Sequence, residues 1–127
     1  LVTGDEGPDP GVRAEVVKHV IGTDIGDDSF ADVIAAAKKK YEPFFLVPDR
    51  GRYSKIKDAW HSLLGDRVIP MHSPSHTCAV AAALVGLGEG QIQGEADLRA
   101  RLAEDNYTDI DAVLDALSGW INSKARV

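Results

Sequence analysis

Pro43-Phe44-Phe45-Leu46-Val47-Pro48-Asp49 is a continuous apolar run that is closed at both ends by proline. The run is too short for a helix, and its aromatic and branched side chains are typical of strands. A strand without polar alternation is expected to be buried on both faces, as strands of parallel sheets are. The run therefore predicts a buried parallel strand.

Two further short strands are predicted around it. Together the three strands cover about Leu1–Thr3, Phe44–Val47 and Val68–Met71. Helical patterns lie between them, and strands that alternate with helices form parallel units with right-handed crossovers. The expected fold is α/β: a three-layer arrangement with a short parallel sheet, a Rossmann-like half, flanked by helices and followed by a C-terminal helical tail.

The predicted helices follow from apolar residues at helical spacing. Two precede the second strand, from about Gly11 to Gly22 and from Phe30 to Tyr41, the latter capped within Asp27–Ser29. A third follows the Pro48–Gly51 turn and ends at Gly65, and an apolar helix covers His76–Leu87. We expect residues 1–90 to form the α/β portion. Residues 91–127 form a helical tail, packed on or following the same domain, with helices at Ala96–Glu104 and Asp109–Ser123.

Length and composition limit the function classes. With 127 residues there is room for one core, and no apolar run approaches the roughly 18 residues that span a bilayer. No leader-like segment opens the chain, and its one cysteine cannot form an internal disulfide, so we expect a cytoplasmic protein of a bacterial-type cytosol. The sequence pI of about 5.1 and the absence of a known motif argue against nucleic-acid binding.

Residues 38–67 hold eight basic and four acidic residues, which predicts either a basic face for an acidic partner or an ordinary solvated surface.

The loop Thr3-Gly4-Asp5-Glu6-Gly7 is the first candidate site. It follows a strand, and the carboxyl ends of parallel strands line the ligand crevice of such sheets. The oxygen atoms of Thr3, Asp5 and Glu6 are suited to Mg²⁺ or Mn²⁺, although one carboxylate and one hydroxyl are too few for a tight site. The alternative is a solvated polar loop.

Several segments resemble the C-terminal half of a von Willebrand factor A-like domain. They are the first loop, Phe44-Phe45-Leu46-Val47-Pro48-Asp49, Trp60-His61-Ser62-Leu63-Leu64-Gly65-Asp66-Arg67-Val68-Ile69 and the apolar helix after them. The resemblance implies a doubly wound sheet whose fourth strand ends in a metal-binding turn, with Asp5 as the inheriting aspartate. The family's main Asp-x-Ser-x-Ser motif is not in the chain, so the resemblance implies a half-domain fragment or a member with an incomplete metal site.

His72-Ser73-Pro74-Ser75-His76-Thr77-Cys78 is the second candidate site. The imidazoles of His72 and His76 and the thiol of Cys78 are donors that zinc accepts, and a thiol near an imidazole is also a candidate nucleophile. The structural alternative makes Ser75 a helix cap and Cys78 a small buried residue.

The leading hypothesis is a non-enzymatic protein-interaction module that recognises a protein partner at the carboxyl edge of its sheet. The rival is a small metal-dependent or cysteine hydrolase centred on His72, His76 and Cys78, and a third interpretation is a purely structural domain. Because Leu1–Thr3 would be an unprotected edge, we expect an upstream segment of a longer protein or a second copy to cover it. We also expect one shared core to contain Phe45, Leu46, Trp60, Val80 and Leu84.

Overall fold

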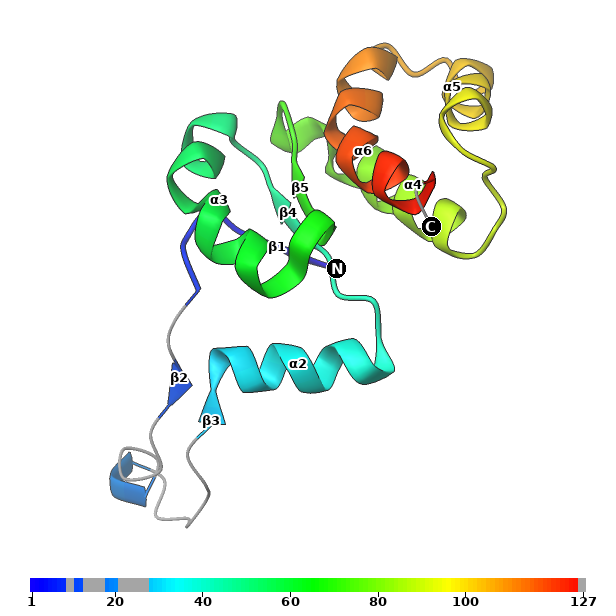
Figure 1. Cartoon of the computed structure of the whole chain (residues 1–127). Coiled ribbons are helices and arrows are strands. Elements are labelled where there is room, and N and C mark those ends of the chain that lie inside the picture. Colours follow the sequence, from blue (N-terminus) through cyan, green and yellow to red (C-terminus); the bar gives the residue numbers. More distant parts are fainter. Residues whose placement is uncertain (9–10, 13–17, 21–27, 126–127) are drawn as a thin grey trace.

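A three-stranded parallel sheet lies at the centre of the computed structural model, which describes residues 1–8, 11–12, 18–20 and 28–125 (Figure 1). Its strands are β1 (Val2–Thr3), β4 (Phe45–Val47) and β5 (Val68–Pro70), in the order β1-β4-β5. Both pairs are parallel, which confirms the three predicted parallel strands. The strand that was predicted to be buried is therefore the central one, hydrogen-bonded on both sides.

Helices flank this sheet, and their ends follow local capping chemistry. The Oγ of Ser29 accepts the N–H of Asp32 at 3.1 Å, and the carboxylate of Asp49 accepts the N–H of Gly51 at 2.6 Å, so each begins a helix. Gly65 ends the second of these helices with a positive φ of 60°, which favours glycine. The helices are α2 (Phe30–Lys40), α3 (Arg50–Leu64), α4 (Thr77–Gly88), α5 (Glu95–Glu104) and α6 (Ile110–Ala125), with 3-10 turns η1 (Gly65–Arg67) and η2 (Pro74–His76).

The helix expected from Gly11 to Gly22 is wrong at its start. Residues Gly11–Val12 form strand β2, which pairs antiparallel with β3 (Asp28–Ser29) just before α2. Pairing with β3 supplies the backbone hydrogen bonds that a helix would otherwise have made there. Residues 18–20 are helical, and the rest of the expected helix lies outside the described residues.

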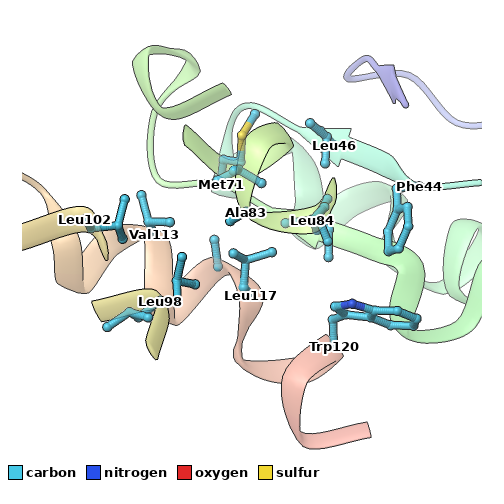
Figure 2. Packing of buried hydrophobic residues seen from close by; sticks show 14 residues of the cluster. Phe44, Leu46, Met71, Ala83, Leu84, Leu98, Leu102, Val113, Leu117 and Trp120 are labelled. Atoms are coloured by element: carbon cyan, nitrogen blue, oxygen red, sulfur yellow. The ribbon is translucent and has the colours of Figure 1, made fainter. Parts of the chain in front are cut away.

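Side chains alternate across β4 and divide the core into two clusters. Phe45 and Val47 pack with Ile56, Trp60 and Leu64 of α3. Phe44 and Leu46 belong to the other cluster, which Figure 2 shows closely, together with residues of α4, α5 and α6. The five residues that we expected in one core are all buried, but Phe45 and Trp60 are separated from Leu46, Val80 and Leu84. The reason is the two-residue period of a strand, which sends Phe45 and Leu46 to opposite faces.

The C-terminal helices share the second cluster with the sheet. Leu98 and Leu102 of α5 and Val113, Leu117 and Trp120 of α6 are buried there. The Trp120 ring meets Phe44 edge to face at 5.0 Å between centroids. The helical tail is thus packed against the strand residues rather than held by a linker. Within the described part of the chain, no helix combines the length and apolarity needed to cross a membrane.

Trp60 should be the most costly side chain to remove from the α3 cluster. Its ring stacks on Phe45 at 3.9 Å and its Nε1 donates to the carbonyl oxygen of Glu6 at 2.9 Å. We expect Trp60→Ala to lower the free energy of unfolding by about 3–5 kcal/mol in urea titrations. Trp60→Phe keeps an aromatic ring but loses the hydrogen bond, so about 1–2 kcal/mol is expected. The control Val33→Ala, at a half-exposed position of α2, should change stability by less than about 0.5 kcal/mol. Equal losses for all three variants would contradict this packing.

Candidate functional site

The carboxyl ends of the three strands lead into loops that carry the predicted site residues. Asp5 and Glu6 follow β1, Asp49 follows β4, and His72 follows β5. Because the strands are parallel, these loops lie at one end of the sheet, where α/β folds of this kind bind ligands.

The loop after β1 is held against α3 through its backbone. The carbonyl oxygen of Asp5 accepts Arg52 Nε at 2.9 Å, and that of Glu6 accepts Trp60 Nε1 at 2.9 Å. Gly4 allows the chain to pass over the Phe45 ring, because a Cβ at this position would lie 3.2 Å from the ring. The loop is therefore fixed relative to the sheet although its side chains are largely exposed.

The donors around Asp5 match a divalent cation poorly. The carboxylate of Glu6 pairs with Arg52 at 3.1 Å, which leaves Asp5 as the uncommitted carboxylate and brings a positive charge to the loop. Across the described residues, no group of three or more histidine, cysteine or acidic side chains is arranged to hold a metal ion. A cation bound through Thr3, Asp5 and Glu6 stays a prediction that this geometry does not favour.

Asp115 of α6 connects the loop after β5 to the start of α3. Its Oδ2 accepts Arg50 Nη2 at 2.6 Å and His72 Nε2 at 2.7 Å. A carboxylate can only accept, so His72 Nε2 carries the proton and, in the neutral imidazole, Nδ1 keeps its lone pair. The hydrogen bond from His72 is the main cause that lowers the pKa of Asp115, and the charge of Arg50 lowers it further against partial desolvation. The result is an ionised carboxylate that orients a half-exposed imidazole.

His76 is placed in a different environment. It is buried, and its Nε2 donates to Asp109 at 3.2 Å, while its buried Nδ1 has no hydrogen-bond partner among the described residues. Cys78 is exposed, so the expectation of a small buried residue is wrong. Helix α4 points Val80, Ala83 and Leu84 into the core and leaves Cys78 outside. Ser73, rather than Ser75, caps the turn by accepting the N–H of Ser75 at 3.2 Å.

The second candidate set is therefore not brought together around one point. His72 and His76 each donate to a separate carboxylate, Asp115 and Asp109. In the described structure neither imidazole hydrogen-bonds to the thiol of Cys78. These contacts are typical of side chains that secure loops against α6, and they supply no activated nucleophile.

Sequence reasoning missed Arg50, Asp109 and Asp115. Asp115 lies 43 residues from His72 and 65 from Arg50, and an aspartate on an amphipathic helix resembles an ordinary solvated residue. Arg50 carried a weak signal, because it lies three residues after the end of a buried strand. Sequence reasoning also missed the contact between Tyr53 and His61, in which the tyrosine hydroxyl lies 2.7 Å from the histidine Nε2.

The outer edge of β1 is the other notable surface at this sheet. The N–H groups of Val2 and Gly4 donate to β4, to Phe44 O at 3.0 Å and Leu46 O at 3.2 Å. Alternation then turns the backbone groups of Thr3 to the outer side, where no described strand pairs with them. Leu1 and Val2 are 58% and 61% exposed, and Val85 of α4 is 58% exposed beside a hollow of about 360 Å³ that Leu1, Phe44 and Leu84 also line. Within the described residues, the expected cover over this edge is not present.

Comparison with known proteins adds no relative: no family model, curated protein or solved structure matches the chain.

The His72–Asp115 contact should be visible in the titration of Asp115. In the parent protein its pKa should lie below the ordinary 3.8, so the pair stabilises the fold above that pH and the contribution is lost as the pH falls through the lowered value. We expect His72→Ala to raise the pKa of Asp115 back toward 3.8. The measurement is the ¹³C chemical shift of the Asp115 side-chain carboxyl carbon as a function of pH. The control His19→Ala, at an exposed histidine, should leave the curve unchanged. An Asp115 curve that does not move in His72→Ala would exclude the contact in solution.

Proposed function

We propose that the chain is a non-enzymatic protein-interaction module whose partner adds an extended segment to the outer edge of β1. The observation that carries this proposal is a strand edge with which no described strand pairs, bordered by the exposed apolar side chains of Leu1, Val2 and Val85. Strand addition uses such an edge, since backbone hydrogen bonds supply affinity and alternate side chains supply specificity.

The apolar residues define the chemistry of the added segment. Val2 is in register with Phe45 and shares its face, which is the face covered by α3. Leu1 lies beside Phe44, Leu84 and Val85 on the face covered by α4. A segment paired with β1 would therefore meet apolar surface on both sides. A strand with apolar residues on both faces fits this position better than an amphipathic helix, which has one apolar face.

The two edge strands of the sheet, β1 and β5, differ in a way that supports this proposal. The N–H of Met71 donates to Val47 at 2.9 Å, so Pro70 occupies the neighbouring position that faces away from β4. Because its position faces away from β4, the missing N–H of Pro70 costs no hydrogen bond within the sheet. It also prevents a further strand from pairing fully at the edge of β5. The edge of β1 has Thr3 at the equivalent outward position, with its donor intact.

The proposal includes a finer architecture and location. We place the sheet in the middle of a three-layer α/β arrangement like that implied by the von Willebrand factor A-like resemblance, and the protein in the cytoplasm. The hydrolase alternative has less support, because His72 and His76 are committed to different carboxylates and Cys78 stands apart from both.

A pair of substitutions at one residue tests the edge. Thr3→Pro removes the outward N–H donor and leaves the bonds from Val2 and Gly4 in place, whereas Thr3→Ala keeps the donor. The probe is the peptide acetyl-Lys-Lys-Val-Ile-Val-Lys-Lys-amide. Its binding is measured from the amide chemical shifts of the ¹⁵N-labelled chain. We expect shifts at Val2–Gly4, and about fivefold weaker binding in Thr3→Pro than in Thr3→Ala, as one lost hydrogen bond predicts.

Matched peptides and a mass measurement complete the design. The same peptide with proline in place of its isoleucine should bind far more weakly, because it cannot complete the ladder. A concentration-dependent dimer in sedimentation that Thr3→Pro abolishes would make a second copy the partner. Equal binding of the two peptides, or equal affinity of the two Thr3 variants, would reject strand addition.

A further inference from the structure

A cavity of about 310 Å³ lies between the end of α4, the loop after it and the last turns of α6. Its walls are mainly apolar, and among the described residues that line it Lys124 is the charged one. The apolar lining residues are Leu87, Ile92, Trp120 and Ile121. A concave apolar space with few polar groups is the usual form of a small-molecule site.

The loop that forms one wall is fixed by its own hydrogen bonds. Gly86 O accepts the N–H groups of Gln91 and Ile92 at 2.8 and 3.0 Å. Arg101 Nη2 donates to the carbonyl oxygen of Gln91 at 2.8 Å. Ile92 presses so closely on α4 that a Cβ on Gly86 would lie 2.5 Å from its Cδ1. The wall is therefore pre-formed, and a ligand would lose little free energy in ordering it.

The charged side chain among the described lining residues is a cation, Lys124, and the carboxylate of Asp97 accepts the backbone N–H of another lining residue, Gln93, at 2.9 Å. Lys124 Nζ lies 4.9 Å from the centroid of the Trp120 ring, and the guanidinium of Arg67 lies 5.4 Å from the same centroid. Both cations face one carboxylate, Glu42, at the long distance of 3.9 Å each. Two positive charges thus share one weakly paired negative charge, and Lys124 is the member that lines the cavity.

We infer that this cavity binds a small apolar monocarboxylate. The apolar body would contact Leu87, Ile92 and Ile121, and the carboxylate would accept a hydrogen bond from Lys124. The volume lies at the lower end of ligand pockets, which limits the ligand to roughly ten to fifteen non-hydrogen atoms. This cavity has no lining residue in common with the hollow beside β1, although Glu42, which lines that hollow, lies 3.9 Å from Lys124.

Two matched probes separate the apolar and ionic parts of recognition. The ¹⁵N-labelled full chain is titrated with 4-phenylbutyrate and with 4-phenylbutanol, which has the same body and no charge. We expect both to shift the amides of Ile92–Gly94 and the indole N–H of Trp120, with the carboxylate binding about three- to tenfold more tightly. Lys124→Met keeps an apolar stem and should abolish the difference. Since Lys124 is half-exposed, this variant should fold normally.

The control is Lys55→Met, which removes a lysine from the exposed surface of α3 and should preserve the preference for the carboxylate. Three outcomes would overturn the assignment: no shifts at Ile92–Gly94 with 4-phenylbutyrate, equal affinity for the acid and the alcohol in the parent chain, or an unchanged preference in Lys124→Met. The amides that report on this cavity do not include Val2–Gly4. A negative result here would therefore not reject strand addition at β1, and a negative result at β1 would not reject ligand binding in this cavity.

Discussion

Burial of β4 on both faces is the constraint on which the rest of the structure depends. Each of its residues is buried, and the strand is hydrogen-bonded to β1 on one side and β5 on the other. Its alternating side chains begin both core clusters, so α3 is recruited to one face and the three later helices to the other. A polar residue within Phe45–Val47 would be costly on either face, because both are sealed from water.

Polar contacts at the carboxyl end of the sheet follow from this packing. Once α3 and α6 are placed on their faces, Arg50 and Asp115 meet across the end of β5, and His72 completes the contact. All three side chains remain partly exposed, so each bond contributes modestly to stability and the group mainly positions the loop. The loop after β1 is secured in the same manner by Arg52 and Trp60. These hydrogen bonds tie both loops to the helices beside them.

The two surfaces proposed for binding have different physical origins. At the edge of β1 the outward backbone groups of Thr3 pair with no described strand, and no proline occupies that position. The cavity beside Trp120 lies between α6 and the loop after α4, whose Ile92 packs closely on Gly86. One surface offers directional backbone bonds, and the other offers an apolar space with a cation at its rim. Neither requires the polar group around Asp115 to change its contacts.

Local pattern alone determined the three strands, the cap at Ser29 and the helices from α2 onward, because apolar periodicity and capping act over a few residues. It also identified five residues of the core, although not their division into two clusters, which depends on the faces that the helices cover. The strand at Gly11–Val12 could not be read from periodicity, since its partner β3 is distant in sequence. The meeting of Arg50, His72 and Asp115, the burial of His76 and the exposure of Cys78 were decided only by tertiary structure. Each depends on where α6 or α4 lies against the sheet, and a helix stripe specifies which face is buried but not which distant residues it will meet.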